Sequence, residues 1–258
     1  MKRALKIIGP MLMLAAAYQP CLAQGGRRAG NDDFRQNNVK LNIFALPLRT
    51  LSVQYERGFT EKISAALSLR LQPDGHIPLR SVFVSAFGIT GEAGNDFADN
   101  ARTSSFAATI EGRYYFGRRP LNGLYLAPFL RYNTYNIDWD YSFVDKNDKV
   151  VPVDISGKGK GFTGGLLIGA QWHIKERFLI DWWIVGPSYG RLNLSLTGSG
   201  GGIGDLDDED RARLEYEVKS VTLGGSSFNA DVQKNSITVT GSIPFPGVRT
   251  GLCVGYTF

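Results

Sequence analysis

Two histidines are the residues of this sequence best suited to proton transfer, and one of them has an acidic residue nearby. His173 precedes Asp181 with a short turn between them, so the two are expected on neighbouring strands near one rim of a sheet. A His–Asp pair is part of nucleophilic triads, but nothing in the sequence selects a serine or cysteine beside it. His76 stands alone at the start of a loop. The sequence therefore predicts a structural hydrogen-bond network at His173 and no catalytic site.

Two glycine-rich stretches and one acidic run are the other candidate binding elements. "GSGGGIG" (198–204) and "SGKGKG" (156–161) lack the preceding buried parallel strand and the Lys-Ser/Thr of a phosphate-binding loop. The acidic residues of 205–210 lack the alternating ligands and the closing glutamate of an EF-hand loop. We expect flexible loops here, and a charged helix over 205–220, with no metal and no cofactor.

The first 23 residues have the layout of a secretory signal peptide. Basic residues at 2, 3 and 6 precede an apolar segment over 7–17, and Ala23 provides a small residue for cleavage. A lipoprotein reading through Cys21 is the alternative, but Gln19 and Pro20 stand where that motif requires small residues. Residues 24–38 have no apolar period and are expected to form a flexible periplasmic leader.

Removal of the signal peptide changes the charge and the cysteine count. Three of the 29 basic residues leave with residues 1–23 and none of the 24 acidic ones, so the net charge falls from +5 to +2. This near balance argues against a general nucleic-acid surface. The mature chain keeps Cys253 alone, which excludes an internal disulfide and a cysteine-rich metal site.

Beyond the leader, apolar and polar residues alternate with a period of two, the pattern of strands with two unlike faces. The alternation predicts eight strands, over 39–45, 51–56, 62–72, 105–116, 124–133, 161–173, 177–185 and 248–258. Tight turns over 57–61, 117–123 and 174–176 are predicted at one end. Long connections are predicted over 73–103, 136–160 and 186–247, and "NSITVTG" (235–241) is expected to extend a strand. Short turns on one side and long loops on the other are typical of an up-and-down outer-membrane barrel.

The polar faces of these strands carry charges that a membrane barrel has to enclose. Because lipid covers the outside of such a barrel, its narrow interior holds the polar side chains. We expect these charges to form an internal network in the lumen: Lys40, Glu56, Arg70, Glu111, Arg113, Arg131, Asp181 and Arg249. The alternative is a soluble periplasmic lipocalin-like binder, with the charges in water and the apolar faces as its core.

Aromatic residues gather at the strand ends nearest the short turns. A ring of aromatics at one level is typical of a membrane interface. The predicted girdle consists of Tyr55, Tyr114, Phe116, Trp172, Phe178, Tyr256 and Phe258. A soluble core gives no reason for such a ring, so the girdle favours the membrane alternative.

The closing strand and two short motifs carry a family resemblance. Phe258, with Tyr256 two residues before it, resembles the C-terminal signal recognised by the outer-membrane barrel assembly machinery, although Cys253 stands where glycine is common. Over residues 39–258 the chain resembles small eight-stranded outer-membrane barrels of the outer-membrane-protein-A-like superfamily. Within it, Lys40-Leu41-Asn42 and Tyr55-Glu56 resemble the strand motifs of an outer-membrane barrel family of unknown function. The resemblance implies the fold and the membrane and supplies no activity.

The expected fold is an all-β, eight-stranded antiparallel up-and-down transmembrane barrel with long extracellular loops. The expected function is that of an integral outer-membrane protein with a structural, adhesive or surface-presentation role, in contact with outer-membrane lipid and lipopolysaccharide. A lipid A-modifying enzyme is an alternative. The residues two after each histidine are Pro78 and Lys175, so the His-x-Ser motif of the deacylase type is absent. The acyltransferase type needs an apolar interior slot, which Glu111, Arg113 and Arg131 would block.

Overall fold

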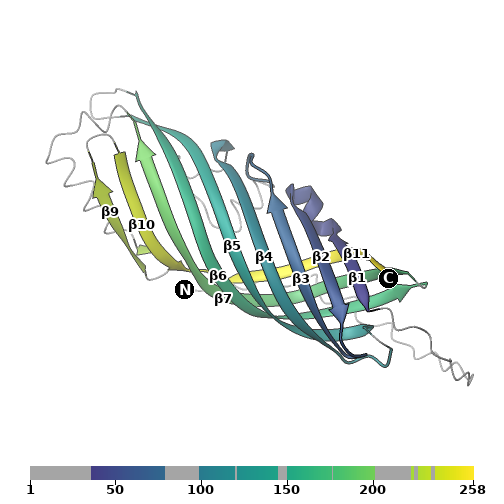
Figure 1. The fold of residues 1–258 in the computed structure, drawn as a ribbon. Coiled ribbons are helices and arrows are strands. Elements are labelled where there is room, and N and C mark those ends of the chain that lie inside the picture. Colours follow the sequence, from purple (N-terminus) through teal and green to yellow (C-terminus); the bar gives the residue numbers. More distant parts are fainter. Residues whose placement is uncertain are drawn as a thin grey trace, which may run out of the picture. The chain divides into compact units, whose positions relative to one another are not determined.

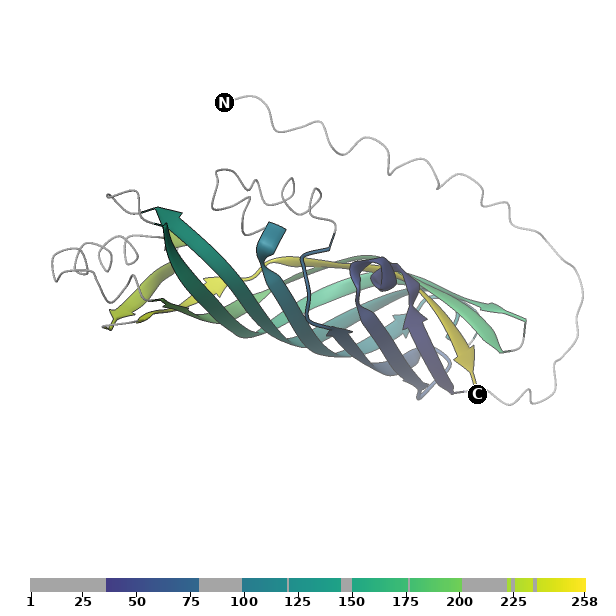
Figure 2. The ribbon, with the colours of Figure 1, turned by 90° about the horizontal axis from the view of Figure 1, so that it is seen from above.

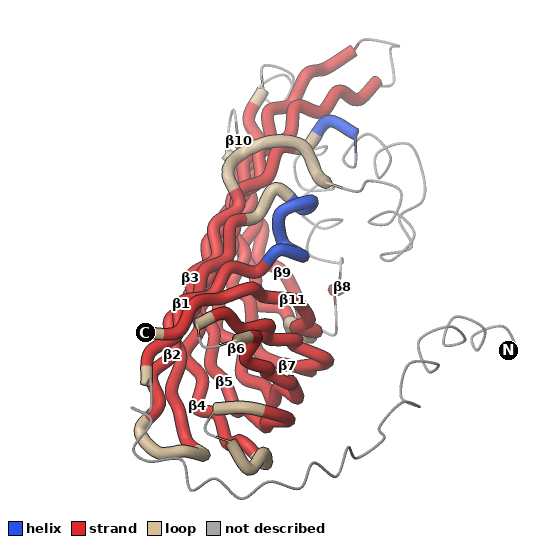
Figure 3. The backbone as a smooth tube through the Cα atoms, turned by 90° about the vertical axis from the view of Figure 1, so that its right-hand side faces the viewer, coloured by secondary structure: helices blue, strands red, loops and turns tan. Residues whose placement is uncertain are grey.

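The fold is seen in a computed structural model of the chain, which describes residues 36–78, 99–119, 121–144, 150–175, 177–200, 222–223, 226–233 and 236–258. The predicted signal peptide, the leader up to residue 35 and the charged helix over 205–220 lie outside these residues. Phe34–Phe258 belong to one unit, and the described residues all lie in it. Nearly all of them are in strands (Figure 3).

The structure contains eleven strands and one short 3-10 helix within the described ranges. Their bounds are β1 Asn37–Asn42, η1 Ile43–Leu48, β2 Leu51–Gly58, β3 Ile63–Gln72, β4 Arg102–Tyr115, β5 Gly123–Val144, β6 Val150–Ile174, β7 Phe178–Ser199, β8 Thr222–Leu223, β9 Ser226–Val232, β10 Ser236–Pro244 and β11 Gly247–Thr257.

Eight of the strands form a closed antiparallel ring, as the sequence predicts. Each of β1 to β6 pairs with the next strand along the chain, and β11 pairs with both β7 and β1. The closure is completed by backbone hydrogen bonds in both directions between Asn37 and Phe258, with N–O distances of 3.2 and 2.9 Å. The ring with its tilted strands is visible in Figures 1 and 2. The fold is thus an eight-stranded up-and-down transmembrane barrel.

Strand β10 continues β11 beyond the ring. It pairs with the far half of β7, from Ser236 opposite Ser199 to Pro244 opposite Arg191, and β9 pairs with its other edge. The sequence expectation of a strand extension at "NSITVTG" is therefore confirmed. β8 adds a two-residue pairing to β9.

Two of the predicted long loops are largely strand. β5 and β6 pair continuously up to Val144 and Val150, so the connection expected over 136–160 is mostly a hairpin. β7 likewise runs to Ser199, far past the predicted end at residue 185. β5, β6 and β7 have 22, 25 and 22 residues, about twice the 9–11 that a tilted strand needs to cross a bilayer. Figure 1 shows them continuing past β1, β2 and β3.

The first strand begins and ends earlier than predicted. It starts at Asn37, inside the expected leader, and it stops at Asn42, so Ile43 and Ala45 belong to η1 and not to a strand. The Asn42 side chain accepts a hydrogen bond from the backbone N–H of Phe44 at 3.0 Å and so caps the helix. Pro47 lies within this turn, where no ladder hydrogen bond is required of it. No helix among the described residues has the length and hydropathy to cross a bilayer.

Within the ring, most large aliphatic side chains face outward, and the charged side chains face the lumen together with a small cluster of buried apolar and aromatic ones. Strand β2 shows a strict alternation, in which Leu51, Val53 and Tyr55 are exposed while Ser52, Gln54 and Glu56 are buried. The same holds along the other ring strands, where Leu67, Ile110, Leu130 and Val254 are all exposed. This arrangement is the reverse of a lipocalin, so the soluble-binder alternative is wrong.

The polarity of the two faces reverses along the long strands. On β6 the outward position changes from Phe162 to Lys160, and on β7 from Tyr189 to Arg191. Beyond that level the inner face is apolar, with Leu192 buried and Leu194 half-buried. An outward face that is apolar on one side of this level and polar on the other marks the boundary of the lipid-facing band.

Glycines on β6 make room for the larger side chains of its neighbours. Gly169 lies opposite Tyr125 and Gly165 opposite Phe129. A Cβ atom at either glycine would overlap the facing aromatic ring. The space is what allows Tyr125 and Phe129 to fold into so narrow a lumen.

Candidate functional site

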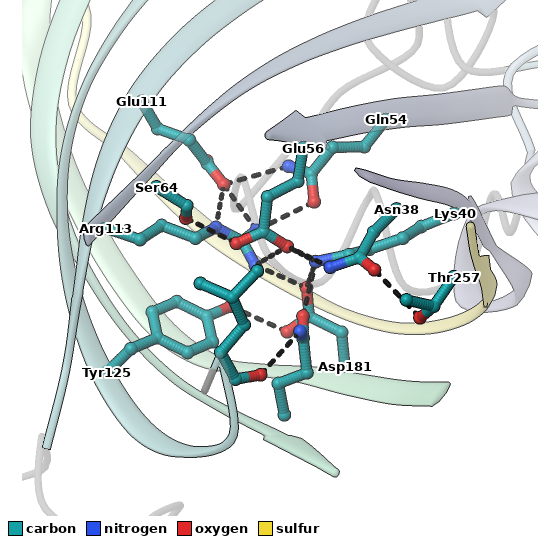
Figure 4. Close-up of polar contacts among 12 residues, drawn as sticks. Asn38, Lys40, Gln54, Glu56, Ser64, Glu111, Arg113, Tyr125, Asp181 and Thr257 are labelled. Carbon is teal, nitrogen blue, oxygen red and sulfur yellow. Dashed lines mark hydrogen bonds and ion pairs between the residues drawn. The ribbon is translucent and has the colours of Figure 1, made fainter. Parts of the chain in front are cut away.

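The lumen of the ring contains a connected network of buried charges, shown in Figure 4. Asp181 on β7 lies at its centre and is completely buried. Its Oδ2 accepts hydrogen bonds from Lys40 Nζ and Arg113 Nη1, each at 2.7 Å, so that both cations reach one carboxylate oxygen. Its other oxygen, Oδ1, accepts from the Tyr125 hydroxyl at 2.7 Å. Asp181 therefore joins β1, β4 and β5 to β7 across the lumen.

Glu56 on β2 is the second carboxylate and binds the same two cations. Lys40 Nζ donates to its Oε2 at 2.5 Å, and Arg113 Nη1 lies 3.5 Å from that oxygen. The other oxygen, Oε1, accepts from Ser64 Oγ at 2.5 Å and from the Tyr115 hydroxyl at 2.6 Å. Both carboxylate oxygens are thereby satisfied, which a buried charge requires.

Glu111 on β4 is the third carboxylate and connects the network to β11. Arg113 Nε donates to its Oε1 at 2.6 Å, and Gln54 Nε2 donates to the same oxygen at 2.8 Å. Arg249 Nη1 donates to Oε2. The Arg249 guanidinium also stacks on the Trp183 ring, with its carbon 4.0 Å from the ring centroid. Such stacking holds a planar guanidinium in a fixed orientation.

Six of the eight predicted lumen charges are brought together in this way. Lys40, Glu56, Glu111, Arg113, Asp181 and Arg249 are linked by ion pairs and are at most 4% exposed. The other two, Arg70 and Arg131, also line the interior but form no ion pair with any acidic residue that the structure describes. Arg131 Nε donates to Thr109 Oγ1 at 2.9 Å. The internal network expected of all eight charges therefore joins six of them by ion pairs.

Uncharged side chains complete the network, and the sequence reasoning did not select them. Gln171 accepts from Lys40 Nζ through Oε1 at 2.5 Å and donates through Nε2 to the Leu121 carbonyl at 2.8 Å. Asn38 donates to Glu56 at 3.2 Å and accepts from Thr257 Oγ1 at 2.8 Å. Gln54 and Gln171 lie on the inward face of their strands together with the charged residues. The alternation of the sequence with a period of two therefore already placed both glutamines in the lumen.

The proposed His–Asp pairing does not occur. In the register of β6 and β7, Asp181 lies opposite Gln171, and His173 lies opposite Leu179. The partners of Asp181 are the two cations, Tyr125 and Trp183, and they do not include His173. The backbone N–H of His173 donates to Asn122 at 3.2 Å. His76 forms an isolated bridge to Arg102 outside the ring.

The seven predicted girdle residues are all exposed on the outside of the ring. Phe178 and Tyr256 pack edge to face with ring centroids 5.9 Å apart, and Tyr114 and Phe116 do so at 5.2 Å. Tyr55 and Tyr256 both lie opposite Val39, which places them at one level of the ring. The exposed fractions of the seven range from 38% for Tyr256 to 59% for Phe178. Exposed Phe59 and Ile174 extend the same rim.

The remaining candidates from the sequence are the metal-binding residues, Cys253, the two glycine-rich stretches and the acidic run. Among the described residues, no group of three or more His, Cys, Asp or Glu side chains is placed to hold a metal ion. Cys253 is buried in a cluster with Tyr115, Tyr125 and Trp183. The stretch 156–161 lies within β6 and is strand, not loop. The acidic run over 205–210 and most of the stretch 198–204 lie outside the described residues.

Three comparisons with known proteins complete the description of the chain. Residues 88–193 match a family model described as a protein of unknown function, DUF3575. No curated protein matches the sequence. Among solved structures, the chain is similar to the translocator domain of the autotransporter NalP from Neisseria meningitidis, with 12% identity, 86% of each chain covered and a TM-score of 0.29. A TM-score of 0.29 is too low to identify the fold of this chain. The closed ring of eight strands and the outward apolar band of the chain itself give it an outer-membrane type of β-barrel fold.

Proposed function

We propose that the protein is an integral outer-membrane barrel with a closed lumen and a structural, adhesive or surface-presentation role. The observation that carries the proposal is the network joining Lys40, Arg113 and Asp181 across the ring. Direct hydrogen bonds span the lumen there from β1 and β4 to β7, so the interior is occupied by protein and not by a water-filled path. A barrel of this kind serves as a rigid support.

The part of the molecule to be presented is the extension of β5, β6, β7 and β10. Its outward face is polar, with exposed Asn136, Asp138, Lys158 and Asn193. We place this extension and the loops between its strands on the extracellular side, because short turns of outer-membrane barrels face the periplasm. Lipopolysaccharide and outer-membrane lipid would surround the apolar band below it.

We further propose that the barrel assembly machinery recognises the chain through β11. Tyr256 and Phe258 are exposed at the rim of this strand, which pairs with both β1 and β7 and so closes the ring. A double substitution, Tyr256→Ala with Phe258→Ala, should reduce the amount of inserted protein in cells more than it reduces refolding into detergent. Equal losses in both settings would contradict recognition through this strand.

The test of the proposed function combines topology with conductance. In a Cys253→Ser background, Asp138→Cys or Lys158→Cys should react with a membrane-impermeant maleimide on intact cells. Glu61→Cys and Lys175→Cys, at the short turns, serve as matched controls and should react only after lysis. Labelling of the short turns on intact cells, or recovery of the protein in the soluble fraction, would refute the assigned orientation or the membrane location.

Two further measurements test the closed lumen and the absence of catalysis. The purified protein in a planar bilayer should show no stepwise conductance, whereas steady open channels would contradict a lumen filled by the Lys40–Asp181 contact. Lipid A from cells that produce the protein should have the same acyl chains as lipid A from cells that lack it. A changed acyl pattern would replace the structural role by the lipid-modifying alternative.

A further inference from the structure

A second feature of the lumen is a cavity of about 270 Å³ between the charge network and η1. Its lining includes the side chains of Arg70, Arg131 and Arg249, from β3, β5 and β11, and the polar residues Asn42 and Ser52. Trp183 and side chains of η1 form its apolar part. We call it the arginine cavity.

The positive charge around the arginine cavity exceeds the negative charge that is available to it. Arg70 and Arg131 have no acidic partner among the described residues. Arg249 is paired with Glu111, but that carboxylate is also bound by Arg113. Among the lumen residues that the structure describes, five cations face three carboxylates, and the two cations without a carboxylate there are Arg70 and Arg131. Like charges side by side in a partly buried cavity repel one another, so a bound anion would stabilise this arrangement.

Two hydrogen-bond donors at the cavity have no acceptor. The Nε–H groups of Arg70 and Arg249 are buried and unpaired. Arg249 is only 4% exposed, and its guanidinium is fixed between Glu111, the Trp183 ring and the Phe129 ring. Buried polar groups without a partner are rare in folded proteins, and each calls for a ligand or another explanation. One of these donors belongs to Arg70, which also carries part of the surplus charge, and the other belongs to Arg249.

We propose that the arginine cavity binds a compact dianion of the phosphate monoester class. A dianion matches the surplus of two positive charges. Guanidinium groups bind phosphate oxygens through paired, charge-assisted hydrogen bonds, and Arg70 and Arg249 have free N–H groups to supply them. The volume equals that of roughly nine water molecules in the liquid, at about 30 Å³ each. It therefore admits a phosphate and part of the group that it esterifies, with Trp183 and η1 as the apolar wall.

This inference goes beyond the structural role, because it gives the same barrel a ligand. The phosphate could belong to a soluble sugar phosphate or to the phosphorylated headgroup of a lipid in the surrounding leaflet. Both present the same chemistry to the three arginines. Separate arms of the experiment distinguish the two sources.

The experiment measures binding by isothermal titration calorimetry to the full mature barrel in an uncharged alkyl glycoside detergent, in phosphate-free buffer. The probes are inorganic phosphate, glucose 6-phosphate and lipopolysaccharide, with glucose as the uncharged control. Wild-type protein should bind at least one phosphate-containing probe saturably and should not bind glucose. Arg70→Gln and Arg131→Gln should each weaken that binding at least tenfold, which corresponds to about 1.4 kcal/mol.

Arg191→Gln is the matched control, because Arg191 is an exposed arginine on the outer face of β7. It removes the same charge from the same protein without touching the cavity, and binding should stay within twofold of the wild type. Binding of lipopolysaccharide alone would identify a lipid headgroup as the source, and binding of glucose 6-phosphate a soluble ester. No saturable binding of any probe, or equal weakening by Arg191→Gln and Arg70→Gln, would overturn the proposal.

The stability of the ligand-free barrel provides a second readout. If the arginines are held together for an anion, Arg70→Gln relieves their repulsion, and its urea midpoint without phosphate should equal or exceed that of the wild type. A saturating phosphate probe should raise the midpoint of the wild type by linkage and leave that of Arg70→Gln nearly unchanged. A ligand-free Arg70→Gln barrel that unfolds at clearly lower urea would show that Arg70 is structural and would overturn its assignment to the site.

Discussion

Replacement of Asp181 by asparagine tests whether the lumen network stabilises the barrel. The substitution keeps the size of the side chain and removes one of the three buried negative charges. Asp181 Oδ2 accepts from Lys40, Arg113 and Trp183, and Oδ1 accepts from the Tyr125 hydroxyl. An asparagine can keep its oxygen toward the first three and turn its amide toward the hydroxyl, which can accept a hydrogen bond. The loss is therefore one of charge and not of shape.

The magnitude follows from the two cations that lose a carboxylate. A hydrogen bond to a charged group contributes about 1.5–3 kcal/mol, and Asp181 receives two of these, both at 2.7 Å. Breaking a buried ion pair by removing one partner costs about 3–5 kcal/mol. Glu56 and Glu111 still bind Lys40 and Arg113, respectively. We therefore expect Asp181→Asn to lower the free energy of unfolding by about 3–5 kcal/mol, which lies within both the sum of the two hydrogen bonds and the cost of breaking a buried ion pair.

Equilibrium unfolding by urea in lipid vesicles, followed by tryptophan fluorescence, measures this change. With a slope of about 2 kcal/mol per molar urea, the midpoint should fall by about 2 M. Asp154→Asn is the control, because Asp154 is an exposed carboxylate on β6, and it should change the free energy of unfolding by less than about 0.5 kcal/mol. If the two variants have the same midpoint, the buried ion pairs do not stabilise the barrel.

A double substitution separates the charge effect from general damage. Lys40→Met removes the cation that Asp181 shares with Glu56. Combined with Asp181→Asn, it restores equal numbers of opposite charges in the network. The double variant should be more stable than the sum of the two single losses predicts, with a coupling of at least about 1 kcal/mol. Strict additivity would mean that the two groups do not act on each other.

Three further predictions concern residues outside the charge network. Arg102 donates hydrogen bonds to Asp74, and these bonds lower the pKa of the Asp74 carboxyl. The contact should therefore persist as the pH falls to about 3.9 and be lost only at lower pH. NMR titration of Asp74 should show a higher midpoint in Arg102→Gln than in the wild type. Phe178→Ala, which removes the ring contact to Tyr256 at 5.9 Å, should cost about 1 kcal/mol in vesicle unfolding experiments, and no change would mean that the girdle pair is not stabilising. Cys253 is 1% exposed, so in the chain without residues 1–23, where it is the single cysteine, it should resist a maleimide until urea unfolds the barrel, and rapid labelling of the folded form would contradict the burial.

The ring and the facing of its side chains could be predicted from the sequence, because a strand repeats every two residues. The alternation along 51–56 places Gln54 and Glu56 on one side and Val53 and Tyr55 on the other, as the structure does. Which of the two sides faces lipid followed from the charges, since eight ionisable residues cannot lie against acyl chains.

The length of β5, β6 and β7 could not be predicted in the same way. Beyond the lipid band, the inner face becomes apolar and the outer face polar, so the pattern reverses while the strand continues. Lys158 and Lys160 on the outer face alternate with glycines on the inner one. A sequence rich in glycine, lysine and aspartate is typical of loops. In the structure, Gly157 and Gly159 instead leave space for leucines of β7, which pack on that inner face.

The pairing of the charges also depends on information that the local sequence lacks. Lys40 lies on β1, whose neighbours are β2 and β11, yet it reaches Asp181 on β7. This contact crosses the lumen between strands that are not adjacent, so it depends on the diameter and tilt of the closed ring. The same geometry leaves Arg70 and Arg131 without a carboxylate partner among the described residues, which a count of charges by strand does not reveal.

Closure of the ring by strands from the two ends of the chain has a consequence for insertion into the bilayer. Asn38 and Thr257 are joined by a hydrogen bond across 219 positions of sequence, and Lys40 and Asp181 are separated by 141. Before the first and last strands meet, Lys40 would have Glu56 of the neighbouring β2 as a counterion but would lack its contact to Asp181, and the loss of such a buried pair costs several kcal/mol. We therefore expect closure of the ring between the first and last strands to be coupled to insertion into the acyl layer. Substitutions that weaken the ion pairs should consequently slow entry into liposomes as well as lower equilibrium stability.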